Sequence, residues 1–427
     1  MRPDPDHIKS HNEAFLMKHQ QSFEFIQREL IDKGLDVDTI IFQLQQFQVA
    51  IPSWALGAGG TRFGRFSIGG EPGDLYQKIS DIAILNDLTG TAGAVSLHIP
   101  WDIPDNLPAL SQWANTCGIK FDAVNSNTFQ DQTDQPFSYK YGSLCHSNSS
   151  IRQQAIQHNI EVINYGKALG SKSITVWLSD GSTFPGQLNF RQALSRTKES
   201  LQEIYTHLPP DWQMFIEYKP YEPQFYSTVI QDWGTSHLLA SACGEQAFSL
   251  VDLGHHLPNT NIEQIVATLL SLGKLGGFHF NDSKYGDDDL TVGSIKPYQL
   301  FLIFLELVSG TADSSVQNPP IAYMIDASHN VKDPLEDLLQ SLEAILLSYA
   351  QALLVDFDKL QILRENNEVV LAQELLQDAY RTDCRPLLRE ARLRKNAAYS
   401  PIGFFRENKI REKLILERGF SNRAKGL

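Results

Sequence analysis

Eight short apolar segments that alternate with helical segments constrain the fold of this chain more than any other feature. Each has the length of a β-strand and is rich in branched or aromatic residues. The predicted strands span 47–52, 94–99, 119–124, 173–178, 213–217, 248–252, 276–280 and 321–326. Eight strands alternating with helices over about 280 residues indicate an α/β fold, a (β/α)₈ TIM barrel, whose typical size is about 250 residues. A doubly wound sheet is the alternative, but no GxGxxG follows the first strand, so its dinucleotide-binding version is unsupported.

Helical segments are predicted inside this pattern and on both sides of it. Residues 10–46 are expected to be mostly helical, with a break near Gly34, and Gly170 is placed to end a helix. The other predicted helices span 151–169, 334–354 and 368–395. From residue 356 onward no further strand is expected. We therefore expect three regions, which are an N-terminal helical arm at 1–46, the barrel at 47–355 and a C-terminal helical extension at 356–427.

Polar side chains follow the predicted strands one after another, at the end of a TIM barrel where catalytic groups gather. In chain order they are Trp54, His98, Trp101, Asn125, Asn127, Trp177, Glu217, Lys219, Asp252, His255, His256, His279, Asn281, Asp282, Asp326, Ser328 and His329. A lone His in an apolar strand is more often a core residue, but four consecutive strands here end in carboxylate or imidazole. Carboxylates buried together repel, and bound cations remove that cost. Mixed Glu, Asp and His ligands suit Mn²⁺, Co²⁺ or Mg²⁺ rather than a closed structural zinc site.

The segment HFNDSKYGDDD at 279–289 is the most specific local signal. Asp287 and Asp289 are two residues apart, so in an extended loop both would point to one side and reach one ion. Asp288 would point the other way, to the surface. A solvated acidic turn is the alternative, but this segment begins at a His-bearing strand. An EF-hand is a poor match, because Val292 stands where the closing Glu should be.

The segment GAGGTRFGRF at 57–66 is rich in glycine. A phosphate-binding loop is one interpretation, but no GK[ST] follows. We expect instead a mobile lid over the barrel mouth, in which Phe63 and Phe66 supply an apolar wall.

The charge distribution argues against a nucleic-acid partner. The net charge is −14, and residues 385–427 hold 12 Lys and Arg against 4 Asp and Glu, so this tail carries +8 and the rest −22. An acidic body favours cations or neutral polyols as ligands. The basic tail is expected to dock on the acidic body or on a neighbouring subunit.

The sequence predicts a cytoplasmic protein. No apolar run approaches the ~20 residues that a membrane span needs, and the start MRPDPDHIKSHNEAF has no apolar region typical of a signal peptide. The four cysteines are far apart and have no zinc-type spacing, which is typical of a reduced compartment.

Several of these segments are similar to known families. EYKPYEP at 217–223 is similar to the Glu-x-Lys-Pro-x-Glu-Pro motif of the xylose-isomerase superfamily. Six further segments resemble bacterial L-rhamnose isomerases of the broad-specificity type, namely IPSWALGAGGTRF, SLHIPWD, FDAVNSNTF, ITVWLSDGSTFPGQ, VDLGHHLPNTNIE and GGFHFNDSKYGDDDL. The matches fall in order along the predicted strands, from about residue 40 to 356, while the lid, the arm and the tail depart from the family pattern.

This resemblance implies a metal-dependent aldose–ketose isomerase that interconverts L-rhamnose and L-rhamnulose, acts on other aldoses and forms a homotetramer. It implies two divalent cations per chain, Mn²⁺ foremost, with Co²⁺, Mg²⁺ or Zn²⁺ as alternatives. One ion would be held by Glu217, Asp252, His279 and Asp326, and the other by His255, Asp287 and Asp289. The sugar would contact Trp54, His98, Phe129, Trp177 and Lys219, together with Phe63 from a neighbouring subunit. Trp101, at the end of the second strand, is expected to join them.

Three residues are the candidates for catalysis. Lys219 would donate to a substrate oxygen, Asp326 would pass a proton between O1 and O2 through a water, and His98 is the candidate base for ring opening. Three alternatives remain open. Another sugar isomerase or epimerase of the same superfamily is one, and a metal-dependent DNA-repair endonuclease, which the acidic body disfavours, is another. A non-catalytic metal scaffold would need neither Lys219 nor an aromatic wall.

Overall fold

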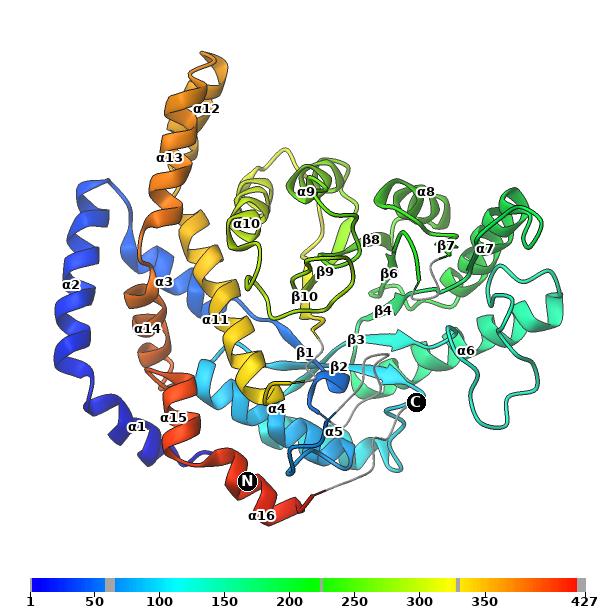
Figure 1. Ribbon diagram of the computed structural model, residues 1–427, viewed down its shortest axis with the longest axis horizontal. Coiled ribbons are helices and arrows are strands. Elements are labelled where there is room, and N and C mark those ends of the chain that lie inside the picture. Colours follow the sequence, from blue (N-terminus) through cyan, green and yellow to red (C-terminus); the bar gives the residue numbers. More distant parts are fainter. Residues whose placement is uncertain (1, 58–65, 223–225, 328–330, 421–427) are drawn as a thin grey trace.

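The computed structural model describes residues 2–57, 66–222, 226–327 and 331–420, and a closed barrel of eight strands lies at its centre (Figure 1). The strands are β1 (Ala50–Pro52), β2 (Ala94–Ile99), β3 (Lys120–Ser126), β4 (Ser173–Val176), β6 (Gln213–Glu217), β8 (Ala247–Asp252), β9 (Leu275–Phe280) and β10 (Ala322–Ile325). Their order around the barrel is β1-β10-β9-β8-β6-β4-β3-β2, and all neighbours are parallel. The predicted TIM barrel and its eight strands are therefore confirmed. A small antiparallel sheet of β5 (Gly181–Ser182) and β7 (Ser227–Thr228) was not predicted.

The register of the strands brings the polar strand ends to one rim. Asp252 lies opposite His279 in the β8–β9 pair, and Ile325 lies opposite Phe280 in the β10–β9 pair. Side chains of a strand alternate between its two faces, so each ligand-type residue shares a face with the residue two positions before it. Phe215 and Leu250, which precede Glu217 and Asp252 in this way, belong to one buried apolar cluster with Ala123 and Phe248. The apolar filling therefore lies directly below the charged rim.

Gly276 in β9 is required by this filling. A Cβ at this position would lie 2.5 Å from the side chain of Phe248 and 2.7 Å from that of Phe215, closer than real Cβ contacts. The missing side chain leaves room for two aromatic rings at the centre of the barrel.

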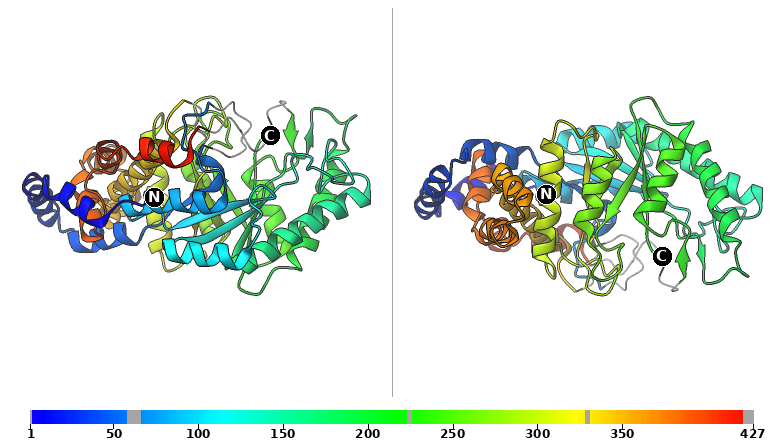
Figure 2. Two further views of the ribbon diagram at one scale, coloured as in Figure 1. Left: turned by 90° about the horizontal axis from the view of Figure 1, so that it is seen from below. Right: turned by 90° about the horizontal axis from the view of Figure 1, so that it is seen from above.

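Helices surround the barrel (Figures 1 and 2). They are α4 (Leu75–Thr89), α5 (Leu107–Cys117), α6 (Ser149–Leu169), α7 (Phe190–Tyr205), α8 (Trp233–Cys243), α9 (Ile262–Ser271), α10 (Pro297–Ala312) and α11 (Pro334–Leu353). The predictions of α6 and α11 are confirmed. The side chain of Asn148 accepts from Ser150 N at the start of α6, and Gly170, at a φ of 89°, ends it.

The N-terminal and C-terminal helices pack together beside the barrel (Figure 1). The N-terminal part forms α1 (Pro5–Glu13), α2 (Leu16–Asp32) and α3 (Val37–Gln46), and the C-terminal part forms α12 (Phe357–Glu365), α13 (Val369–Arg381), α14 (Arg385–Arg394), α15 (Pro401–Glu407) and α16 (Ile410–Arg418). Asn12 Nδ2 donates to the Ala397 carbonyl at 2.9 Å, and His19 Nε2 lies 2.8 Å from Glu390 Oε2. The predicted break near Gly34 is confirmed, because α2 ends at Asp32 and Gly34 has a φ of 79°.

The prediction of one continuous helix over 368–395 is wrong. The structure has two helices there, α13 and α14, separated by residues 382–384. Pro386 has no N–H to donate to the carbonyl of residue 382, so a helix cannot run through this point without losing a hydrogen bond. Thr382 accordingly takes an extended conformation, with φ −69° and ψ 128°.

The basic tail docks on the acidic body of its own chain. Arg411 in α16 donates to both oxygens of Asp333 at 2.7 and 2.8 Å. Arg418, also in α16, donates to both oxygens of Asp81 in α4 at 2.8 and 2.7 Å. The first of the two expectations for the tail is therefore confirmed.

Within the described ranges, no single helix is long and apolar enough to cross a membrane. The helices α11 and α12 reach the required length and composition only as a pair that is bent by 64°.

Candidate metal centre and aromatic wall

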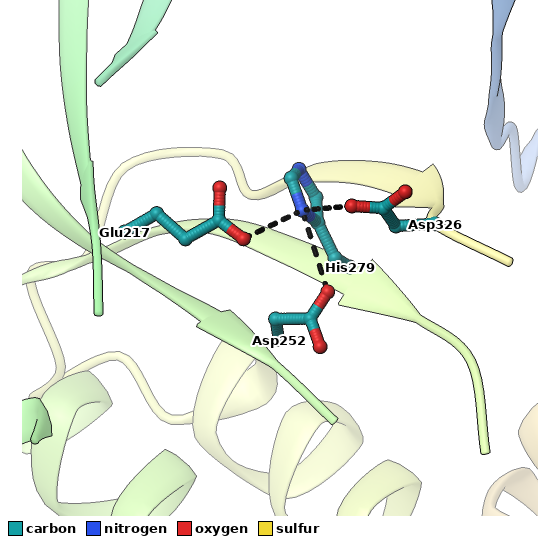
Figure 3. A group of neighbouring side chains, drawn as sticks. All are labelled: Glu217, Asp252, His279 and Asp326. Atoms are coloured by element: carbon teal, nitrogen blue, oxygen red, sulfur yellow. Dashed lines mark ion pairs between the residues drawn. The ribbon is translucent and has the colours of Figure 1, made fainter. Parts of the chain in front are cut away.

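Four ligand-type side chains converge at the carboxyl end of the barrel, each from a different strand (Figure 3). Glu217 ends β6, Asp252 ends β8, His279 lies near the end of β9, and Asp326 directly follows β10. His279 Nδ1 lies 3.5 Å from Glu217 Oε1 and 3.6 Å from both Asp252 Oδ2 and Asp326 Oδ2. In the part of the chain that the structure describes, no other group of three or more His, Cys, Asp or Glu side chains offers ligand atoms within 4.8 Å of one another.

These distances fit ligands around a cation better than they fit hydrogen bonds. A separation of 3.5 to 3.6 Å exceeds ordinary N–H···O lengths, and neither His279 Nδ1 nor Asp252 Oδ2 has a hydrogen-bond partner although both atoms are buried. Four ligand atoms placed tetrahedrally about 2.1 Å from an ion would lie about 3.4 Å apart. Three carboxylates and one imidazole also suit Mn²⁺, Co²⁺, Mg²⁺ or Zn²⁺. The residues present therefore fit a divalent cation.

The electrostatics of the four side chains favour positive charge at their centre. Burial alone would lower the pKa of His279, but Glu217 and Asp252 raise it well above its ordinary value. Burial alone would raise the pKa of Glu217, but His279 and His255 lower it to about 2. Burial, Asp252 and Glu217 together raise the pKa of Asp326 to about 6. The imidazoles supply positive charge next to these carboxylates, and a divalent cation would supply it in their place.

Asn281 holds one ligand in place. Its Nδ2 donates to Asp252 Oδ1 at 2.9 Å and to the Asp326 carbonyl at 3.0 Å. The Gly254 N–H donates to the same Asp252 oxygen at 2.7 Å, so Oδ2 is left to face His279. The sequence placed Asn281 at a strand end but gave it no role, because its partners lie on other strands.

A second set of charged side chains lies beside Glu217. His255 Nδ1 is 3.2 Å from Glu217 Oε1, and His255 Nε2 is 3.2 Å from Asp287 Oδ1. The Asp287 N–H donates to the Gly254 carbonyl at 3.0 Å and so ties the acidic loop to the turn after β8. The structure thus brings two of the three residues expected for a second ion to the edge of the first cluster.

The acidic loop does not have the expected backbone. Asp287 and Asp289 have φ values of 56° and 47°, in the left-handed region, so the argument from an extended loop is wrong. Asp287 is buried, whereas Asp289 is partly exposed. Asp288 was expected to be a surface residue, but its carboxylate accepts from the backbone N–H groups of residues 284–286 and from Ser283 Oγ at 2.7 to 3.2 Å. Asp288 therefore closes the turn that carries its two neighbours.

Lys219 is buried and held from two sides. Its Nζ lies 2.8 Å from Glu222 Oε1 and 2.6 Å from Asp287 Oδ2. The same atom lies 5.2 Å from the ring centre of Trp177. The ammonium group can only donate hydrogen bonds, and both neighbouring carboxylates can accept them. Glu222 was not predicted as a site residue, although its place in the EYKPYEP segment, three residues after Lys219, was a signal.

Five rings form a continuous group that we call the aromatic wall, made of Trp54, His98, Trp101, Phe129 and Trp177. His98 stacks on Trp101 with ring centres 4.1 Å apart, and it meets Trp54 and Phe129 edge-on at 5.4 and 5.6 Å. Phe129 lies 4.6 Å from Trp177. The structure thus brings together these five residues, which were expected to contact the sugar.

The aromatic wall adjoins the candidate metal centre at two points. Trp54 Nε1 donates to Asp326 Oδ1 at 3.0 Å, and Trp177 lies beside Lys219. Phe63, Ser328 and His329 were also expected near this site, but they lie outside the described residues. Phe66 is described and is 72% exposed.

The His98 imidazole is neutral at physiological pH. Burial lowers the pKa of His98 to about 3, so the ring is in the form that can accept a proton. The buried carboxylate of Asp102 accepts from the His98 backbone N–H at 2.8 Å and from Lys78 Nζ at 2.7 Å. It also accepts from the Ser53 hydroxyl, beside Trp54. Asp102 thus ties the exits of β1 and β2 together, a role that could not be predicted from the sequence.

Two curated proteins are similar to this chain over most of its length. No family model matches the chain. A probable sugar isomerase of Mesorhizobium japonicum is 49% identical over 411 residues, which cover 96% of this chain and 95% of the relative. A probable sugar isomerase of Rhizobium meliloti is 50% identical over 398 residues, which cover 93% and 92%.

Solved structures share the fold at low sequence identity. An L-ribulose 3-epimerase matches with a TM-score of 0.55 and 12% identity, covering 76% of this chain and 98% of that one. A D-allulose 3-epimerase from Methylomonas sp., in complex with D-allulose, matches with a TM-score of 0.53 and 11% identity, covering 71% and 97%. At such identities the likeness shows the barrel architecture alone.

Proposed function

Because this chain belongs to the family of the probable sugar isomerases from Mesorhizobium japonicum and Rhizobium meliloti, we propose that it is a divalent-metal-dependent aldose–ketose isomerase. We propose L-rhamnose and L-rhamnulose as its main substrate pair, with activity on other aldoses. The observation that carries this proposal is the convergence of three carboxylates and one imidazole at the barrel rim, beside a buried lysine and an aromatic wall.

Two cations per chain, Mn²⁺ foremost, are part of the proposal. Glu217, Asp252, His279 and Asp326 would hold one, and His255, Asp287 and Asp289 would hold the other. When bound, the cations polarise the sugar carbonyl and offset the negative charge that develops on its oxygens. The 3.2 Å contact between Glu217 and His255 supports neighbouring sites.

Asp326 is the proposed carrier of the proton between O1 and O2. Its side chain is 24% exposed, whereas the side chains of Glu217, Asp252 and His279 are at most 5% exposed. Asp326 is therefore the member of the cluster that a sugar or a water can reach. Its Oδ1 is held by Trp54, which fixes the orientation of the carboxylate.

The other site residues bind and orient the sugar. Lys219 would donate a hydrogen bond to a substrate oxygen, since its place between Glu222 and Asp287 fixes the direction of its ammonium group. His98, neutral and buried, is the proposed base for opening the sugar ring. The aromatic wall would pack on C–H faces of the sugar and exclude water.

We further propose a cytoplasmic homotetramer in which Phe63 of a neighbouring subunit completes the site. The arm and the C-terminal extension, which pack on each other, would contribute to the subunit contacts. Light scattering at micromolar concentration is expected to give the mass of four chains. A monomer would contradict the assembly and any role of Phe63 in a neighbour's site.

Turnover of a sugar panel by metal-stripped and reconstituted protein tests the proposed activity. We expect no ketose from L-rhamnose in excess EDTA and full activity after dialysis into Mn²⁺. Protein carried through the same dialysis steps without EDTA is the matched control and should keep its activity. Product identification by NMR separates the alternatives, because an epimerase would convert one ketose into another without forming an aldose. That result, or full activity in EDTA, would overturn the proposal.

A further inference from the structure

Two buried residues that have no part in the proposed chemistry form a direct contact behind it. Tyr218 follows Glu217 at the end of β6, and His256 follows His255 after β8. The Tyr218 hydroxyl lies 2.7 Å from His256 Nε2. Tyr218 is 1% exposed and His256 is 9% exposed, and their rings meet edge-on at 84°.

The direction of this hydrogen bond follows from the surroundings of the imidazole. His256 Nδ1 lies 3.4 Å from the Leu253 carbonyl, which can only accept. The proton is therefore assigned to Nδ1, and Nε2 is left to accept from the Tyr218 hydroxyl.

The contact joins two strand ends beyond the point where their backbones pair. The last register pair between β6 and β8 joins Glu217 to Leu250. Leu250 lies two residues before Asp252. After that point the chain makes a tight turn, in which the His255 N–H donates to the Asp252 carbonyl at 3.2 Å. The Tyr218–His256 hydrogen bond thus ties the turn that carries Asp252 and His255 to the strand end that carries Glu217.

We propose that Tyr218 and His256 are positioning residues that set the separation between Glu217 and His255 and thereby the affinity of the site for a divalent cation. The inference rests on the proposed metal-dependent function, but it concerns binding, which can be measured without a sugar. Partners that orient metal ligands in this way typically change metal affinity by about 10- to 100-fold when they are removed.

Titration calorimetry with Mn²⁺ on metal-stripped protein tests this inference. We expect Tyr218→Phe and His256→Leu each to weaken Mn²⁺ binding about tenfold or more. His256→Gln, which keeps an acceptor in this position, should retain most of the affinity. The double variant Tyr218→Phe/His256→Leu should be no weaker than the single variants, because both remove the same bond. At saturating Mn²⁺ the sugar KM should match that of the parent.

Tyr205→Phe is the matched control, because its phenol oxygen accepts from the Gln246 N–H at 3.3 Å outside the site. If Tyr218→Phe binds Mn²⁺ as tightly as Tyr205→Phe, or lowers only the melting temperature, the inference is wrong. If the parent itself does not bind Mn²⁺, the proposed function fails instead. Should Tyr218→Phe not fold, the comparison of His256→Gln with His256→Leu decides, and equal affinities in that pair would overturn the inference.

Discussion

The buried ion pair between Arg418 and Asp81 is expected to decide how firmly the C-terminal extension is held. The guanidinium makes two hydrogen bonds to Asp81 and a third to the Gly70 carbonyl at 3.1 Å. The side chains of Arg418 and Asp81 are only 3% and 1% exposed. Arg418→Gln would leave a buried carboxylate without its counter-charge, which typically costs about 3–5 kcal/mol. We expect the free energy of unfolding in urea, followed by tryptophan fluorescence, to fall by about that amount.

The matched control is Arg406→Gln in the same extension. Arg406 also makes a two-pronged pair, with Glu336, but its side chain is 70% exposed. Exposed pairs contribute about 0.2–1 kcal/mol, so this variant should remain close to the parent. Equal losses in the two variants would refute the reasoning from burial.

The loss should also depend on pH. Burial raises the pKa of Asp81 in the folded state despite Arg418. A carboxyl whose folded pKa is raised destabilises the fold when it is ionised, and this penalty shrinks as the pH falls below that pKa and is gone below the unfolded pKa. The defect of Arg418→Gln should therefore be larger at about pH 8 than at about pH 5. Adding Asp81→Asn should recover part of the lost stability at the higher pH.

Three further predictions concern the candidate site. Changing Asp287 and Asp289 together to Asn should keep the fold and one metal ion per chain. It should lower kcat about 10²- to 10³-fold, because charge stabilisation in the transition state is lost. Turnover at the parent rate would place the second ion elsewhere. Glu217→Gln should lower both the melting temperature and activity, since Glu217 faces His279 and His255 at once, and an unchanged melt would contradict this. Removal of metal with EDTA should lower the melting temperature. Mn²⁺ at about 100 times its Kd should then raise the free energy of unfolding by about 2.7 kcal/mol. An identical melting curve with and without Mn²⁺ would argue against a bound ion.

The barrel and its rim could be predicted because both depend on short-range pattern. β8 and β9 are buried along their whole length because they are covered on both faces, and each has a polar residue at or near its end, Asp252 and His279. Parallel strands share one carboxyl end, so the convergence of Glu217, Asp252 and His279 followed from topology alone. The distances between these side chains depend on the register of the strands, which cannot be read from the sequence. The same is true of the role of Asn281, which orients the Asp252 carboxylate by a hydrogen bond.

The loops could not be predicted in the same way. The left-handed backbone at Asp287 and Asp289 is stabilised by hydrogen bonds to the Asp288 carboxylate, and a pattern of side-chain alternation carries no information on such bonds. Asp102 acts through partners on other elements, Ser53 and Lys78, whereas Glu222 lies three residues after its partner Lys219 and could have been predicted from that spacing. The break between α13 and α14 was predictable from Pro386, because a proline has no N–H for the helix hydrogen bond.

The place where the barrel closes has a dynamic consequence for the site. β1 and β10 share a single register pair, Ala50 with Met324, whereas β9 and β10 share four. The Trp54–Asp326 hydrogen bond spans this same seam. Regions with few backbone hydrogen bonds open locally at low free energy, so native-state hydrogen exchange should be fastest, among the barrel strands, at the β1–β10 seam. Such an opening would release Asp326, the most exposed of the four candidate ligands, while the other three stay anchored, so the site could fluctuate without any loss of the global fold.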